Sequence, residues 1–304
     1  MKISALLPYF GSKRTLAPRI VAELGPHRSY WEPFCGSMAV LLAKPVCSQE
    51  TVNDLYGDLV NLARVIRHAR YGPALYRQLR RTMVHERLFA EAETIVRDAE
   101  YRPCADVVGP ADAERAYQFF VACWLGRNGV IGTTKGSCGK QFSVRYTTNG
   151  GIQGTRFVSA VSSIPCWRRR ISEVTILCRD GFKLLERIED AEGTAIYCDP
   201  PYLAKGAEYI HDFEAGDHAR LAGLLGRFRA ARVVVSYYQH PALDKLYPGW
   251  TSVICNVTKS LVNQGRRGRE SKAIAPEVLL VNGPSFTGKA NVNTLFEDDN
   301  ADII

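Results

Sequence analysis

The chain of 304 residues alternates strand-like and helical segments in two separate stretches, and this alternation limits its possible folds more than any other feature. In the first stretch, residues 29–34 predict a strand and residues 37–44 a helix. Residues 50–55 predict a second strand, and residues 59–69 resume helical spacing. The stretch therefore has the rhythm of a βαβα unit.

The second stretch repeats this rhythm nearer the end of the chain. Its segments follow in the order strand 173–180, helix 181–189, strand 194–198, helix 217–230, strand 232–238, strand 251–258 and strand 276–282. Strands that alternate with helices favour a mostly parallel sheet with helices on both faces. The last two strands have no clear helix between them, which indicates an antiparallel strand at the end of the sheet. We therefore predict an α/β fold with a doubly wound, mostly parallel sheet.

Residues 63–170 interrupt the alternation, and we predict that they form an inserted second domain. Helical segments are expected around 73–97 and 112–125. The following "GRNGVIGTTKGSCGKQFSVRYTTNGG" has the turn density of β-hairpins. The predicted domains are therefore 1–62 with 171–290, the mainly helical plus β-hairpin insert 63–170, and an acidic C-terminal tail 291–304.

The charge of the chain indicates a polyanionic partner. The formal net charge is +8, and the tail 291–304 carries four acids and no base, so the preceding part is +12. Such a charge favours phosphate contacts, although solubility alone would also explain it. The chain has no run of 18 apolar residues, and its first residues reach Gly, Lys and Arg too early for a signal peptide. Nine cysteines without a C-x-x-C pair fit a reducing compartment, so we expect a cytoplasmic protein.

Three polar features stand where predicted parallel strands end, which is where ligands bind in doubly wound sheets. Gly36 allows a tight turn and a close backbone approach after the first strand. Asp54 ends the second strand, about where an acid reaches ribose hydroxyls in nucleoside-binding folds. Asp180 ends a third strand, with Phe182 beside it, and could meet an adenine edge. Each aspartate could equally cap a helix, but together the three favour a nucleoside-containing cofactor.

A fourth strand end carries the sequence Asp199-Pro200-Pro201-Tyr202. Prolines have no backbone N–H and restrict the conformation around them, so this turn presents acceptors only, the Asp199 carboxylate and the Pro200 carbonyl. Acceptors alone suit an exocyclic amino group, because drawing both its hydrogens into hydrogen bonds frees the nitrogen lone pair to attack an electrophile. Tyr202 could stack on the base that carries this amine. A plain turn is the alternative interpretation.

Four segments together identify a family resemblance. "PYFGSKRTLAPRIV", "YWEPFCGSMAVLLAK", "VNDLYGDLVN" and "YCDPPY" resemble the Dam-type DNA adenine-N6 methyltransferases, which use S-adenosyl-L-methionine. The match covers roughly residues 8–62 and 174–283 and implies a sheet of the seven-stranded methyltransferase type. The insert then occupies the position of the target-recognition domain. The order of the segments is more specific than any one of them.

The resemblance assigns roles to residues of this chain. It implies cofactor contacts by Tyr9, Lys13, Phe34, Gly36, Asp54, Asp180, Phe182 and Asp199, and a catalytic turn of Asp199, Pro200, Pro201 and Tyr202. Two departures stand out: Tyr9 replaces the usual Trp, and Met38 replaces the second glycine of the cofactor loop, giving "FCGSM". The Met38 side chain could crowd the cofactor, or pack where the helix starts.

Contacts with double-stranded DNA are expected mainly in the insert. "LGRNGVIG" resembles an Asn-Arg-x-x-x-Asn-Gly stretch of the family, and the expected DNA-binding residues are Arg127, Asn128, Lys135, Lys140, Arg145 and Tyr146. Tyr202, and Tyr237 or Tyr238, could receive a flipped base; ordinary strand packing is the alternative for the last two. The basic runs 168–170 and 263–272 could hold phosphates or be solvated.

We predict a site-specific DNA methyltransferase that transfers a methyl group from S-adenosyl-L-methionine to N6 of a flipped adenine. The alternatives are an RNA or N4-cytosine methyltransferase, or an inactive DNA-binding homologue. We expect no metal, because the six histidines show no ligand spacing, and no membrane association. A monomer encoded by a bacterium or phage is expected.

Overall fold

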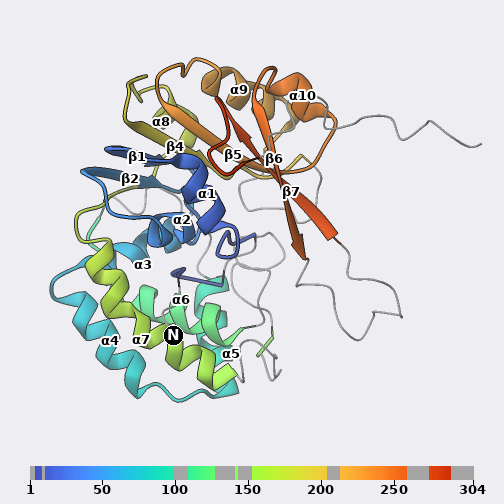
Figure 1. The fold of residues 1–304 in the computed structure, drawn as a ribbon. Helices are drawn as coiled ribbons and strands as arrows, with labels where there is room; N and C mark the ends of the chain where they lie inside the picture. Colours follow the sequence, from blue (N-terminus) through green and yellow to red (C-terminus); the bar gives the residue numbers. More distant parts are fainter. Residues whose placement is uncertain are drawn as a thin grey trace, which may run out of the picture.

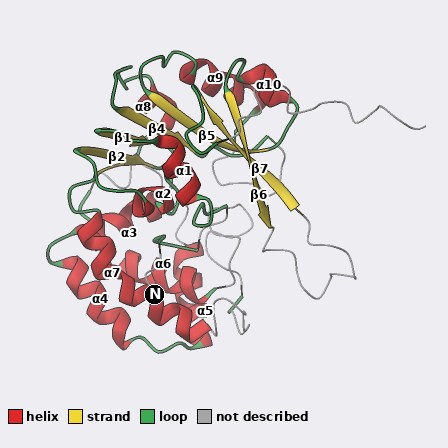
Figure 2. Cartoon of the chain, viewed as in Figure 1, coloured by secondary structure: helices red, strands yellow, loops and turns green. Residues whose placement is uncertain are grey.

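The computed structural model describes residues 4–8, 11–98, 109–126, 141–142, 153–203, 213–258 and 274–288. Within them, seven strands form one sheet, which Figure 2 draws in yellow. The strands are β1 (Ser29–Glu32), β2 (Gln49–Asn53), β3 (Thr175–Leu177), β4 (Thr194–Cys198), β5 (Arg232–Tyr238), β6 (Thr251–Thr258) and β7 (Ile274–Val281). Their order in the sheet is β3-β2-β1-β4-β5-β7-β6.

The pairing confirms the predicted doubly wound α/β sheet. Strands β3, β2, β1, β4 and β5 are parallel, and β7 pairs antiparallel with both β5 and β6. Strand β1 lies between β2 and β4, so the chain order reverses at the edge shared by β1 and β4. A crevice opens beyond the carboxyl ends of the strands at such a reversal, and this is where open α/β sheets bind ligands.

Helices cover both faces of the sheet, as the alternation predicts. One face packs against α1 (Ala17–Leu24) and α2 (Ala39–Ala43), and the other against α8 (Gly181–Leu185), α9 (Ala215–Leu225) and α10 (Ala242–Leu246). The side chains of β4 alternate between the two cores because successive side chains in a strand point to opposite faces. Ala195 and Tyr197 belong to the first core, and Ile196 and Cys198 to the second.

Five further helices form a layer beside the first face of the sheet (Figure 1). They are α3 (Gly57–Arg67), α4 (Tyr71–Arg81), α5 (Glu86–Asp98), α6 (Ala113–Leu125) and α7 (Gln153–Arg170). Helix α6 is buried on almost every side, which is expected of a helix that is apolar all round and packs among others. The helices predicted around 73–97 and 112–125 are thus α4, α5 and α6.

Helix α7 and the short α1 and α10 were not predicted. The α7 sequence "QGTRFVSAVSSIPCWRRR" contains Gly, Thr and Ser, and Pro165 lies inside the helix, so its local preference for helix is poor. Tertiary packing overrides this preference, because one apolar face of α7 is buried in the core. That face consists of Phe157, Ala160, Val161, Ile164 and Trp167. Their spacing of three and four residues is the signal that could have revealed the helix.

The predicted hairpin of the insert lies almost entirely outside the described residues. An isolated antiparallel bridge joins Gly126 to Phe142 at its edge. The division into domains at 63–170 and the tail 291–304 stay predictions. None of the helices that the structure describes has both the length and the apolar character needed to cross a membrane.

Candidate active site

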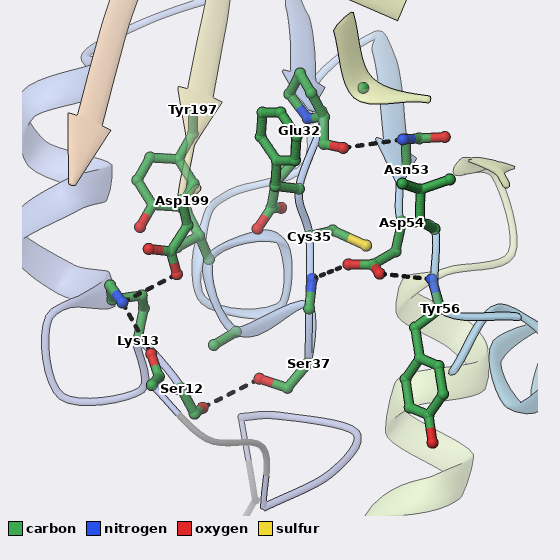
Figure 3. Close-up of a pocket in the computed structure, with 18 of the residues that line it drawn as sticks. Ser12, Lys13, Glu32, Cys35, Ser37, Asn53, Asp54, Tyr56, Tyr197 and Asp199 are labelled. Carbon is green, nitrogen blue, oxygen red and sulfur yellow. Dashed lines mark hydrogen bonds and ion pairs between the residues drawn. The ribbon is translucent and has the colours of Figure 1, made fainter. Parts of the chain in front are cut away.

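A pocket opens at the carboxyl ends of β1, β2 and β4, the position that the strand-end residues predict (Figure 3). Its wall comes from six parts of the chain: the segment before α1, the turn after β1 with the start of α2, the turn after β2, the start of α8, the end of β4 with its turn, and the segment before α9. The lining residues are Gly11, Ser12, Lys13, Glu32, Pro33, Phe34, Cys35, Gly36, Ser37, Ala39, Val40, Asn53, Asp54, Leu55, Tyr56, Gly181, Tyr197, Asp199, Pro201 and Phe213. Lys13, Phe34, Gly36, Asp54, Asp199 and Pro201 among them were expected from the sequence.

Asp54 joins the turns that follow β1 and β2. Its Oδ2 accepts the Gly36 N–H at 2.8 Å, and its Oδ1 accepts the Tyr56 N–H at 2.9 Å. Gly36 has φ of 45°, a left-handed conformation that favours glycine. Burial raises the pKa of the Asp54 carboxyl above its usual value, while these N–H donors oppose that rise. The Leu55 N–H also bonds to this carboxylate, so one of its roughly four lone-pair sites remains for a hydroxyl donor from a ligand.

Asp199 forms an ion pair with a buried cation, Lys13, at one end of the pocket. Its Oδ2 lies 3.0 Å from Lys13 Nζ, and the Lys13 side chain is only 5% exposed. Lys13 Nζ also donates to the Gly11 carbonyl at 2.9 Å and lies 4.9 Å from the centre of the Tyr202 ring. A buried ammonium is tolerated where it has a carboxylate partner and further acceptors. Lys13 and Asp199 thus present opposite charges at one end of the pocket.

The Tyr202 ring lies against β5 and β7. It meets the Tyr238 ring edge-on, with centroids 4.5 Å apart, and its hydroxyl donates to Glu277 Oε2 at 3.5 Å. Tyr237, by contrast, is fully buried in the second core, so strand packing is the correct interpretation for that residue. Burial raises the pKa of the Glu277 carboxyl above its usual value.

Two comparisons with known proteins agree with this geometry. A family model described as D12 class N6 adenine-specific DNA methyltransferase matches residues 9–259. The chain is also similar to the Retron Ec67 DNA adenine methylase of Escherichia coli, with 25% identity over 285 residues that cover 92% of each chain. This chain belongs to the D12 class of N6 adenine-specific DNA methyltransferases. The predicted family, fold and reaction are therefore confirmed.

In this methyltransferase, Asp180 caps a helix. Its Oδ1 accepts the N–H of Phe182 at 2.7 Å and of Lys183 at 3.4 Å, and the residue does not line the pocket. Phe182 is buried and does not line the pocket either, but its ring contacts two rings that do. Phe34 meets it edge-on at 6.3 Å between centroids, and Phe213 stacks on it at 5.2 Å. Phe213 was not predicted, because it lies far from every strand end in the sequence.

Met38 packs into the core and does not line the pocket of the methyltransferase. It is fully buried and lies in the left-handed region at φ 58°, ψ 31°, just before α2. No other non-glycine residue in the described ranges has a positive φ. The side chain therefore does not crowd the pocket, and its burial offsets a backbone strain of about 1–2 kcal/mol.

We expect the substitution Met38→Gly to lower the free energy of unfolding by about 1–3 kcal/mol. Loss of the buried side chain costs about 2–5 kcal/mol, and relief of the backbone strain returns part of it. Urea denaturation of both proteins measures the difference. A variant more stable than the parent would mean that strain outweighs packing at this position.

Glu32 is a buried acid in the wall of the pocket. Its side chain is 1% exposed and accepts the Tyr30 hydroxyl at 2.9 Å. Burial, with Asp199 nearby, raises the pKa of Glu32 from 4.5 to about 8, so the group is mostly protonated at neutral pH. Glu32 lies in the quoted segment "YWEPFCGSMAVLLAK", but its burial depends on the sheet and could not be read from the sequence.

The raised pKa of Glu32 predicts a stability that falls with pH. Between about pH 4.5 and 8 the folded state holds a proton that the unfolded state releases, so this contribution is present below pH 4.5 and is lost as pH rises toward 8. We expect the difference in unfolding free energy between the parent and Glu32→Gln to change by about 3 kcal/mol between pH 5 and pH 7.5. Denaturation across this range measures it, with the exposed Glu192→Gln as the control. Parallel pH profiles for the parent and Glu32→Gln would contradict it.

Several predicted contacts of the methyltransferase lie outside the described residues. These are the cofactor residue Tyr9, the DNA-binding residues Arg127, Asn128, Lys135, Lys140, Arg145 and Tyr146, and the basic run 263–272. Of the run 168–170, Arg170 has an internal role that was not predicted: both of its terminal nitrogens donate to Glu50, at 2.5 and 2.8 Å. Within the described ranges, no group of three or more His, Cys, Asp or Glu side chains is arranged to hold a metal ion.

Proposed function

We propose that the pocket binds S-adenosyl-L-methionine and that the Asp199–Tyr202 turn holds the N6 amine of a flipped adenine beside it. One observation carries this proposal: Asp199 follows β4 into the same pocket that Gly36 and Asp54 line. The acceptor turn and the nucleoside-type features are therefore parts of one site.

The chemistry of the lining fits this cofactor. The amino-acid part of S-adenosyl-L-methionine carries an ammonium and a carboxylate, and Lys13 with Asp199 offers the matching charges. Asp54 has acceptor capacity for a ribose hydroxyl, and the rings of Phe34 and Phe213 offer apolar surface for adenine. When bound, the cofactor supplies a methyl group made electrophilic by a sulfonium sulfur.

The residues of the turn act on the target amine. The Asp199 carboxylate and the Pro200 carbonyl accept its two hydrogens, which leaves the nitrogen lone pair available. In this proposal the same Asp199 carboxylate also takes the proton that the amine must release after methylation. Tyr202 stacks on the base, worth about 1–3 kcal/mol, and Tyr238 supports the Tyr202 ring at its edge.

DNA recognition is assigned to the insert. The base must leave the helix to reach Asp199, which costs a few kcal/mol. We propose that Arg127, Asn128, Lys135, Lys140, Arg145 and Tyr146 supply the contacts that compensate for this cost. Methylation then depends on a DNA site that the insert selects, and the enzyme acts as a monomer.

The test uses purified protein, cofactor with a labelled methyl group, and duplex DNA. Digestion to nucleosides should place the label in N6-methyl-2′-deoxyadenosine, and structured RNA should stay unlabelled. Label in N4-methylcytosine or in RNA would overturn the assignment of the substrate. Sequencing DNA from expressing cells, with detection of modified bases, then gives the sequence context.

A further inference from the structure

A buried chain of hydroxyl groups stands behind Asp199. Ser236 Oγ on β5 lies 2.8 Å from Asp199 Oδ1, and Tyr197 Oη on β4 lies 2.9 Å from Ser236 Oγ. Ser236 is 0% exposed and Tyr197 is 1% exposed. The Oδ2 atom of the same carboxylate faces Lys13, so the two oxygens of Asp199 have different surroundings.

The direction of these hydrogen bonds follows from the groups present. An ionised carboxylate only accepts, so Ser236 donates to Asp199. Ser236 has one hydroxyl hydrogen, so it must accept from Tyr197. Burial raises the pKa of the Tyr197 hydroxyl well above its usual value, so this donor keeps its hydrogen. The chain therefore runs from Tyr197 through Ser236 to Asp199.

The register of the sheet brings the three side chains together. Tyr197 pairs with Val234 and Cys198 with Val235, so the next positions, Asp199 and Ser236, lie side by side. Side chains two residues apart in a strand share a face. Tyr197, Asp199 and Ser236 thus meet on one face at the pocket edge of the sheet.

We propose that Ser236 and Tyr197 are positioning residues for methyl transfer, which hold Asp199 through Oδ1 in the orientation that presents its carboxylate to the target amine. The inference rests on the proposed function of Asp199. Asp199 stands just beyond the end of β4 and its side chain is 22% exposed, so a carboxylate held by Lys13 at Oδ2 alone could still rotate. Displacement of a catalytic group by about 1 Å can cost a hundredfold in rate.

A purely structural role for these hydroxyls predicts a different result. Buried polar groups in a core are normally hydrogen-bonded, and removing one partner costs about 1–3 kcal/mol of stability. In that case substitution would lower stability and leave kcat of the folded protein unchanged. Measuring kcat, KM and stability on the same variants therefore distinguishes a positioning role from a purely structural one.

The experiment compares Ser236→Ala, Tyr197→Phe, the double variant and Ser236→Thr, which keeps the donor. We expect kcat to fall about 10- to 100-fold in Ser236→Ala and less in Tyr197→Phe. The double variant should be no worse than Ser236→Ala, because the residues act in series. Ser236→Thr should recover most of kcat. Ser163→Ala and Tyr117→Phe, which remove buried hydroxyls in the helical layer, are the controls and should keep the parent kcat.

Two binding measurements complete the test. The affinity for S-adenosylhomocysteine and the KM for DNA should stay within about threefold of the parent. The fluorescence of 2-aminopurine at the target position rises when the base unstacks, and it should show that the base still leaves the helix. Because this analogue lacks the 6-amino group, the signal does not depend on the contact between Asp199 and the amine. A Ser236→Ala variant with kcat within twofold of the parent, or with its whole defect in KM, would overturn the proposal.

Asp199→Ala in the same assay separates this inference from the proposed function. If Asp199→Ala is inactive while Ser236→Ala and Tyr197→Phe have the parent kcat, only the positioning role is wrong. If Asp199→Ala still methylates DNA, the assignment of the catalytic turn is wrong, and the positioning role is wrong with it. Should Ser236→Ala fail to fold, Tyr197→Phe and Ser236→Thr still decide the question.

Discussion

Replacing Asp199 by alanine is expected to reduce methyl transfer about a hundredfold to a thousandfold. The substitution removes the carboxylate that accepts the target amine, and loss of one such group aimed at the reacting atoms costs about 10²–10³ in rate. It also leaves Lys13, which is 5% exposed, without its carboxylate partner 3.0 Å away. We therefore expect lower stability as well, with cofactor binding largely kept through Asp54 and the aromatic rings.

Single-turnover transfer of a labelled methyl group to duplex DNA measures the effect, and calorimetry with S-adenosylhomocysteine measures binding. Asp199→Asn is the informative partner variant, because it keeps one acceptor oxygen and nearly the same shape, and it should be less impaired. The exposed Asp244→Ala is the surface control. Residual transfer above about 1% of the parent rate in Asp199→Ala would contradict the assignment.

Replacing Arg115 by alanine is expected to lower the free energy of unfolding by about 3–5 kcal/mol. Arg115 on α6 forms a two-pronged ion pair with Asp58 on α3, with both N–O distances at 2.8 Å, and the Asp58 side chain is 2% exposed. Arg115 also donates to the carbonyls of Ile95 and Val96 on α5. Removing one partner of a buried pair leaves an uncompensated charge, which is strongly destabilising.

Urea denaturation, followed by a helical and an aromatic signal, measures this loss. The matched control is Arg87→Ala, because Arg87 pairs with Glu91 at the surface, with side chains 82% and 55% exposed. Such exposed pairs contribute between 0 and about 1 kcal/mol. A loss below about 1 kcal/mol for Arg115→Ala would show that the interior relaxes around Asp58 or admits water to it.

Most of the sheet was predictable from the sequence because its strands are short, β-branched and bounded by polar turns. Strand β5 spans the residues predicted for it, 232–238, and the antiparallel end of the sheet follows from a missing helix between the last two strands. Helix α7 was not predicted, because Gly, Ser and Pro165 weaken the local signal and burial against α3, α4 and α6 decides its conformation.

The site was predictable where residues stand at strand ends, since parallel strands bring their ends together. Gly36, Asp54 and Asp199 meet for this reason. Lys13 and Asp199 were both expected in the site, but the ion pair between them was not predicted. Glu32 and Ser236 escaped notice because their burial and partners depend on the strand order, and no local pattern in the sequence carries that information.

The helical layer is inserted in the chain between two neighbouring strands, β2 and β3, and this position allows the inserted segment to vary in length and sequence. The chain leaves the sheet after β2 and returns at β3, and these strands are neighbours, with Thr51 paired to Thr175. Closing a loop between two fixed neighbouring points depends only weakly on its length, and each doubling costs about 0.6 kcal/mol. Segments between these points can therefore be lengthened, shortened or exchanged while the strands that carry Asp54 and Asp199 keep their register. Because we propose that this inserted segment selects the DNA site, exchanging it would change the DNA target and leave the strands that carry the pocket in place.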